Sequence, residues 1–346
     1  MRKIFKIQNR IVSNNHPPLI IAEIGINHNG NLEKAIQIAD SAIKSGVEII
    51  KHQTHIPDEE MSIESKNVIP GNSNKSIYEI IKKSTLSEKD EFKLMQYIKQ
   101  KKKIFISTPF CKAAVDRLIK FRVPAFKIGS GECNNLELVK YICKFKKPII
   151  LSTGMNSIKT ILPTVRLIEK YKSPLAIMHC TNVYPTPINK SRLNSIIQLK
   201  EKFKNHIIGY SDHTIGIECA ISAVSLGALI IEKHYVDSRL RKGPDISCSM
   251  DKKELKKILE ISNKIKNAVK GKKEPIKEEK ITMKFAFASV VARRNIEKGE
   301  TISEKNICLK RPGNGYFKFN QFRKLLGKKA KKYICENTQL KRKDIF

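Results

Sequence analysis

Two histidines stand in the same kind of position in this sequence, each at the end of a short apolar run. His213 follows the run IIGYSD, and His234 closes the run LIIEKH. If these runs are neighbouring strands, the two imidazoles can approach each other despite their separation in the sequence. Neutral imidazoles bind Mn, Fe, Co, Ni or Zn, and a site with few protein ligands leaves positions open for water and substrate. We interpret the pair as metal ligands, and the alternative is two hydrogen-bonded histidines without a metal.

Two lysines lie inside apolar runs, where an unpaired ammonium group is costly to bury. They are Lys51 in VEIIKHQ and Lys127 in AFKIGSGE. Such a lysine either forms a Schiff base or holds an anion, and the alternative is a strand-edge lysine that reaches solvent. Hydroxyl and amide groups at the ends of other runs favour a ligand that carries a phosphate and a carboxylate. These groups belong to Thr108, Ser130, Ser152, Asn182 and Ser211.

Carboxylates also stand near the ends of these runs. Glu23 and Glu132 are in EIG and GSGE, and Asp245 is in RKGPDIS after the last run. A carboxylate beside a metal or a substrate can orient a hydroxyl group or move a proton. For Asp245 the alternative is a structural aspartate that closes a Gly-Pro turn.

The elements that must position these groups alternate along the chain. Eight short runs rich in Ile, Val and Phe are separated by longer segments with helical spacing. This alternation predicts a (β/α)8 TIM barrel, whereas the alternative open sheet lacks support because no GxGxxG follows the first run. The runs are 18–25, 47–53, 104–110, 125–132, 148–154, 175–182, 207–213 and 229–235.

Every one of the eight runs ends in polar residues. In a barrel the carboxyl ends of the strands converge on one face, so we expect these endings to form a single ring. The endings are Glu23; Lys51, His52 and Gln53; Ser107 and Thr108; Lys127, Ser130 and Glu132; Ser152 and Thr153; His179 and Asn182; Ser211, Asp212 and His213; and Glu232, Lys233 and His234.

Composition limits the class of protein. Of 346 residues, 40% are hydrophobic, yet no apolar run approaches the roughly 20 residues of a membrane span. The start MRKIFKIQNR lacks a secretory h-region, so we expect a cytoplasmic protein without a membrane segment. The eight cysteines are scattered without a CxxC pair, which favours free thiols.

The formal charge of +34 raises the possibility of a polyanion partner. Most of the excess is lysine spread over the helical segments, so we interpret it as a solvated surface and expect no nucleic acid partner. A polyanion-binding protein on a barrel scaffold is the alternative from another functional class.

The C-terminal part differs in composition from the rest. After a predicted barrel domain at 1–267, residues 268–284 are polar and charged and are predicted to be a linker. Residues 285–346 contain short β-like runs between KG, PG and LG turns, and at this size docking on a partner would help them to fold. This small domain is either a stability or dimerisation module or a lid that contributes Arg311.

With these features together, the chain resembles bacterial N-acetylneuraminate (sialic acid) synthases over almost its whole length. The resemblance lies in EIGINHNG, KHQTH, VIPGN with SIYEI, STPF, FKIGSGECNN, LSTGMNSI, HCTNVYPTP, SDHT, EKHYVDS, GPDISCSM, FAFASVVA and KRPGNG. The tail resembles the antifreeze-like SAF domain of these enzymes. EKHY stands where many relatives have ERHF, and PFCKAA where many have PFSRAA, and neither difference affects a predicted site residue.

The resemblance implies a transferase that condenses phosphoenolpyruvate with N-acetylmannosamine and water, releasing phosphate by C–O cleavage. It implies a divalent metal at His213 and His234, Mn²⁺ first and Mg²⁺ or Co²⁺ as alternatives, and a domain-swapped homodimer in which Arg311 acts on the partner's sugar. The positions that match phosphoenolpyruvate ligands are Lys51, Thr108, Lys127, Ser130, Ser152, Asn182 and Ser211. The positions that match sugar or metal-water contacts are Glu23, Gln53, Asn72, Tyr184, Asp245, Phe285 and Arg311, and Glu132 matches a proton-transfer group.

The sugar is the open point of this interpretation. A 6-deoxy diacetamido sugar would make the enzyme a legionaminic acid synthase, and some relatives use a phosphorylated sugar. The VIPGN and SIYEI stretch favours unphosphorylated N-acetylmannosamine, by resemblance alone.

Overall fold

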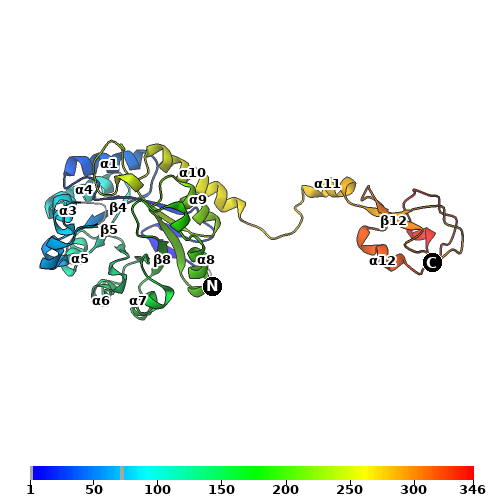
Figure 1. Ribbon diagram of the computed structural model, residues 1–346, viewed down its shortest axis with the longest axis horizontal. Helices are drawn as coiled ribbons and strands as arrows, with labels where there is room; N and C mark the ends of the chain where they lie inside the picture. Colours follow the sequence, from blue (N-terminus) through cyan, green and yellow to red (C-terminus); the bar gives the residue numbers. More distant parts are fainter. Residues whose placement is uncertain (1–2, 71–73) are drawn as a thin grey trace. The chain divides into compact units, whose positions relative to one another are not determined.

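The computed structural model describes residues 3–70 and 74–346 as two compact units, Met1–Lys270 and Gly271–Phe346. In the first unit eight parallel strands close into a barrel in the order β10-β3-β4-β5-β6-β7-β8-β9 (Figure 1). The predicted (β/α)8 barrel is therefore confirmed, and the open sheet is wrong. The barrel strands are β3 (Leu19–Gly25), β4 (Ile49–Thr54), β5 (Ile104–Pro109), β6 (Phe126–Ile128), β7 (Ile149–Ser152), β8 (Leu175–Cys180), β9 (Ile207–Asp212) and β10 (Ile230–His234).

Helices follow the strands and cover the outside of the barrel (Figure 1). Their apolar stripes pack on the outward-facing strand residues and form one large core. Most helices begin at a side chain that accepts a hydrogen bond from the first turn, such as Asn31, Ser87 and Asp251. These helices are α1 (Leu32–Lys44), α4 (Glu88–Gln100), α5 (Lys112–Lys120), α6 (Leu136–Cys143), α7 (Ile158–Lys170), α8 (Asn194–Lys202), α9 (Glu218–Ser225) and α10 (Lys252–Ala268).

Two regions of the barrel unit are not simple strand-to-helix connections. The antiparallel hairpin β1 (Phe5–Ile7) and β2 (Arg10–Val12) buries Phe5, Ile7 and Val12 against the interior residues at the amino ends of the barrel strands. This end of the barrel is therefore filled with apolar side chains. Between β4 and α4 the chain forms α2 (Pro57–Glu60), the 3₁₀ turn η1 (Ile63–Asn67) and α3 (Ile77–Ser84).

The second unit is the small C-terminal domain. It contains α11 (Glu279–Ala286), α12 (Phe322–Leu325) and the antiparallel pair β11 (Ser289–Ala292) and β12 (Ile307–Lys310), with 3₁₀ turns η5 (Phe319–Gln321) and η6 (Arg342–Asp344). Its own apolar core includes Val290, Ile296, Ile307 and Leu340.

All eight cysteines are free thiols, as expected from their spacing. Within residues 3–70 and 74–346 no helix combines the length and apolar character that crossing a membrane requires.

Candidate active site

A cavity of about 320 Å³ opens at the carboxyl ends of the barrel strands. Side chains alternate between the two faces of a strand, so every second strand-end residue faces this cavity. Most residues of the predicted ring line it together, although they come from all parts of the barrel sequence. These are Lys51, Gln53, Thr108, Lys127, Ser130, Glu132, Ser152, Asn182, Ser211, His213, Glu232 and His234, and the predicted residues Tyr184 and Asp245 line the cavity as well.

The remaining predicted residues have other positions. Glu23 is not among the residues that line the cavity, but its buried carboxylate pairs with the cavity residue Lys51 and accepts a hydrogen bond from Gln53 at 3.1 Å. Asn72 lies outside the described residues. Phe285 and Arg311 belong to the C-terminal unit, in which the Phe285 side chain is 60% exposed.

The expectation that all polar strand endings face one ring is wrong for about a third of them. The alternation of strand side chains turns the intervening residues outward, and they are buried between the strands and the covering helices. The outward residues are His52, Ser107, Thr153, His179, Asp212 and Lys233.

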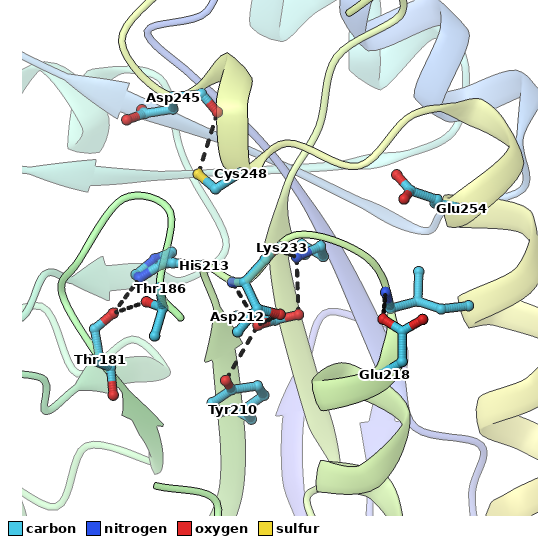
Figure 2. Close-up of polar contacts among 12 residues, drawn as sticks. Thr181, Thr186, Tyr210, Asp212, His213, Glu218, Lys233, Asp245, Cys248 and Glu254 are labelled. Carbon is cyan, nitrogen blue, oxygen red and sulfur yellow. Dashed lines mark hydrogen bonds and ion pairs between the residues drawn. The ribbon is translucent and has the colours of Figure 1, made fainter. Parts of the chain in front are cut away.

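The two predicted histidines meet at the cavity wall. Their ring centroids lie 5.5 Å apart, and both side chains are buried. His213 Nδ1 hydrogen-bonds to the carbonyl of Thr181 at 2.8 Å, which leaves its Nε2 available to a ligand (Figure 2). His234 Nδ1 is buried and has no hydrogen-bond partner among the described residues, and the Asp245 carboxylate lies 3.5 Å away.

This donor set fits a divalent transition metal. Burial lowers the pKa of His213 to about 4 and that of His234 well below its usual value, so both rings are neutral at pH 7, the form that binds metals. No group of three or more His, Cys, Asp or Glu side chains in metal-binding geometry occurs in the described part of the chain. Two imidazoles alone would leave most coordination positions to substrate and water, as catalytic metals require.

The two lysines form a buried charge cluster on the cavity floor with two glutamates. Lys51 Nζ pairs with Glu23 and lies 3.6 Å from Glu232, while Lys127 Nζ lies 3.7 Å from the same Glu232 oxygen. Burial alone would lower the pKa of Lys51, but the two carboxylates outweigh it and raise that pKa. Burial opposes ionisation of Glu232, but Lys127 and Lys51 lower its pKa, so this carboxylate stays charged.

Glu232 is a site residue that the sequence analysis placed among the strand endings but gave no catalytic or binding role. It accepts a hydrogen bond from Ser211 at 3.3 Å, and its second oxygen has no hydrogen-bond partner among the described residues. The signal was available: Glu232 stands two residues before His234 on one strand, so a cavity-facing His234 places Glu232 on the same face.

Hydroxyl and backbone groups form a polar wall next to Lys127. Lys127 Nζ donates to Ser152 Oγ at 2.6 Å, and the N–H of Gly154 donates to Ser130 Oγ at 3.0 Å. A Cβ atom on Gly154 would collide with the side-chain oxygen of Asn182, so only glycine lets the backbone approach this closely. The wall thus presents donors beside an ammonium group, a combination suited to an anion.

Two carboxyl groups at the cavity have strongly raised pKa values. Burial raises the pKa of Glu132 to about 7. Burial, together with the charge of Glu23, raises the pKa of Asp245 to about 7 against the attraction of Lys51. Both groups can therefore gain or lose a proton near neutral pH.

Comparison with known proteins identifies the family of the chain. Residues 38–274 match the NeuB family, and residues 287–345 match the SAF domain. The chain is 36% identical to the N,N'-diacetyllegionaminic acid synthase of Campylobacter jejuni, over 92% of this chain and 97% of that protein. It is 34% identical to the pseudaminic acid synthase of the same organism, over 94% of this chain and 96% of that protein.

A solved structure gives the same result at the level of the fold. The N-acetylneuraminic acid synthetase of Leptospira borgpetersenii, in complex with citrate, has a TM-score of 0.75 and 31% sequence identity, and the match covers 82% of this chain and 96% of that one. With a barrel that gathers the expected residues at one mouth and a matching C-terminal domain, the chain belongs to the NeuB family of sialic, legionaminic and pseudaminic acid synthases and carries a SAF domain.

Proposed function

We propose that this chain is an N-acetylneuraminate synthase, which condenses phosphoenolpyruvate with N-acetylmannosamine and water to give sialic acid and phosphate. One observation carries the proposal: two neutral imidazoles and two buried ammonium groups line one cavity of about 320 Å³. The first pair suits a metal and the second an anion with several negative charges. Phosphoenolpyruvate is such an anion, and an aldehyde oxygen is a ligand that such a metal accepts.

The lysines would hold phosphoenolpyruvate. In the free protein their charge is balanced by Glu23 and Glu232, so the substrate would compete with these carboxylates for Lys51 and Lys127. The Ser130 and Ser152 hydroxyls would add neutral donors around the same anion. Because both ammonium groups are already paired, neither needs a Schiff base to explain its burial.

The histidines would hold the metal. A divalent metal at His213 and His234, Mn²⁺ in the first instance, would polarise the carbonyl of the open-chain sugar. Tyr184 packs on His213 with ring centroids 4.2 Å apart, so it helps to fix that imidazole at the sugar side of the cavity.

The reaction forms one carbon-carbon bond and requires a group that transfers a proton. C3 of phosphoenolpyruvate bonds to the aldehyde carbon, water adds at C2, and the bond from C2 to the phosphate oxygen breaks. Glu132, with its pKa of about 7, is the group we assign to proton transfer, because it can release and accept a proton at the working pH. The carboxylates of Glu23 and Asp245 would orient water and sugar hydroxyl groups.

A second candidate sugar has specific support. The relative that is 36% identical is named N,N'-diacetyllegionaminic acid synthase, so a 6-deoxy diacetamido sugar is the alternative substrate. A panel of N-acylated mannosamines with and without a C6 hydroxyl, assayed by phosphate release from phosphoenolpyruvate, decides between the two. The sugar with the highest kcat/KM identifies the substrate, and no release with any of them would refute the proposed function.

Isotope labelling tests the bond that breaks. With ¹⁸O in the oxygen that bridges C2 and phosphorus, C–O cleavage transfers the label to phosphate. Retention of the label in the nine-carbon acid would contradict the proposal.

We further propose a domain-swapped homodimer in the cytoplasm. The C-terminal unit would place Arg311 at the partner's sugar, as the family resemblance implies. Free thiols throughout the chain are consistent with a reducing compartment.

The polyanion-binding alternative makes a different prediction. Its affinity for mixed-sequence DNA would fall steeply with salt, and phosphate release would be absent. Phosphate release that EDTA abolishes and Mn²⁺ restores would remove this alternative.

A further inference from the structure

Behind the two histidines, on the outer face of the same strands, lies a second buried charge pair. Asp212 and Lys233 stand opposite each other in the register of β9 and β10, and their charged atoms are 2.9 Å apart. Their side chains are 0% and 1% exposed. Neither lines the cavity, so the proposed reaction gives them no direct contact with a substrate.

The pair is tied to the backbone on both sides of His213 (Figure 2). One oxygen of Asp212 accepts hydrogen bonds from the Tyr210 hydroxyl at 3.2 Å, the Thr214 N–H at 3.0 Å and the Thr214 hydroxyl at 2.9 Å. Lys233 Nζ donates to the Thr214 carbonyl at 2.5 Å as well as to Asp212. The turn that carries His213 is therefore bound to the residue that precedes His234.

The two imidazoles depend on this connection to different degrees. His213 has its own hydrogen bond to Thr181, and its carbonyl accepts from the Thr186 N–H at 2.8 Å. His234 Nδ1 has no hydrogen-bond partner among the described residues, and the ring has only looser contacts, with the Asp245 carboxylate at 3.5 Å and with the Tyr184 ring, so its position depends more on its backbone. Lys233 is the adjacent residue on that backbone.

A buried ion pair is a poor source of stability, because a well-packed apolar pair of similar volume often does as well. The ion pair instead fixes the relative position of the two strand ends, because its hydrogen bonds are directional. We propose that Asp212 and Lys233 are positioning residues that hold His213 and His234 at the spacing that a divalent metal requires. This inference rests on the proposed function, since it presupposes that the two histidines bind a metal.

The test is Mn²⁺ binding to the full chain without substrates, measured by the EPR signal of free Mn²⁺. Lys233→Met keeps most of the length of the side chain and removes its charge, and we expect Mn²⁺ affinity to fall at least tenfold. Pulsed EPR of bound Mn²⁺ should show coupling to two histidine nitrogens in the wild type and a weakened second coupling in the variant.

The matched control is Arg117→Met. Arg117 pairs with the buried carboxylate of Glu91 at 3.2 Å, between α4 and α5, and does not line the cavity, so its replacement by Met removes a comparable cation from outside the site. We expect this variant to bind Mn²⁺ as the wild type does. If Lys233→Met does not fold, Thr214→Val removes only one hydrogen bond to Asp212 and should weaken Mn²⁺ binding by a smaller factor.

Unchanged affinity in the folded Lys233→Met or Thr214→Val variant, or equal weakening in the Arg117→Met control, would overturn the inference alone. Failure of the wild type to bind Mn²⁺ would instead remove the proposed metal, and the positioning role with it.

Discussion

The rings of His213 and His234 lie 5.5 Å apart, centroid to centroid, with their planes inclined by 50°. They belong to neighbouring strand ends and are both buried, although the sequence between them forms a complete helix, α9. Because burial keeps both rings neutral at pH 7, no proton competes with a metal at physiological pH. The spacing and the protonation state together make this pair the best-defined chemical feature of the cavity.

Removing one imidazole should remove the metal and leave the fold. We expect His234→Ala to lose at least about 100-fold in activity at limiting Mn²⁺, with partial recovery at high Mn²⁺, because one of two protein ligands is gone. The unfolding temperature of the metal-free protein should change little, since His234 Nδ1 makes no hydrogen bond to the described residues that folding would lose.

The matched control is His206→Ala. His206 pairs with Glu169 at 2.8 Å and does not line the cavity, so its removal should leave Mn²⁺ dependence unchanged. Full turnover of His234→Ala in chelated buffer would show that the histidines are not metal ligands.

Removing one ammonium group should affect phosphoenolpyruvate selectively. Lys127→Met breaks the bond to Ser152 and leaves Glu232 with one cation fewer. Loss of one partner of a buried charge pair costs about 2–5 kcal/mol, so we expect the KM for phosphoenolpyruvate to rise at least about 30-fold. Steady-state kinetics with each substrate varied should show a much smaller change for the sugar. Lys140→Met, on the exposed face of α6, is the control, and an equal rise in both KM values would contradict the assignment.

Glu132 should make the wild type less stable as the pH rises. Its pKa is about 7 in the folded protein against an unperturbed value of 4.5, so the folded state binds this proton more tightly. The resulting stabilisation is complete below about pH 4.5 and is lost as the pH rises through 7. Glu132→Gln stays neutral at every pH, so it should be more stable than the wild type at pH 8, by roughly 1–3 kcal/mol, and equal to it near pH 4.

Urea unfolding at the two pH values measures this difference. Asp245 has the same raised pKa but is present in both proteins, so its contribution cancels in the comparison. The same variant should be nearly inactive if Glu132 transfers the proton. If the difference in unfolding free energy between Glu132→Gln and the wild type were the same at pH 8 and pH 4, the environment of Glu132 would not disfavour its charged form.

The barrel could be predicted because its strands are short apolar runs that end in polar residues. The inward and outward faces were also implicit in the sequence, since alternation alone separates Glu232 and His234 from Lys233. What the sequence pattern did not predict was the partner of each outward group. Lys233 meets Asp212 through the register of two strands that are separate in sequence, and no local pattern encodes that register.

Other features lacked a periodic signal. The strands of the amino-terminal hairpin are three residues each, too short for alternation to be recognised. Among the described residues of the insertion between β4 and α4, α3 alone is a helix longer than five residues. The predicted linker at 268–284 had a compositional signal but no periodic one, and α11 begins inside it at Glu279 and extends to Ala286.

Arg311 provides the test of a shared active site. If it acts on the partner's sugar, Arg311→Ala alone should raise the KM for the sugar far more than that for phosphoenolpyruvate, because its guanidinium would contact only the sugar. The stronger test mixes two impaired variants under conditions in which each alone shows little activity, at limiting Mn²⁺ and low sugar concentration. In a heterodimer of His234→Ala and Arg311→Ala, one barrel keeps its histidines and receives an intact arginine from the other chain. One of the two active sites of each heterodimer is therefore complete. We therefore expect activity to return on mixing and refolding the two variants together. If Arg311 acted on its own barrel, every site in the heterodimer would carry one defect, and the mixture would stay as inactive as its components.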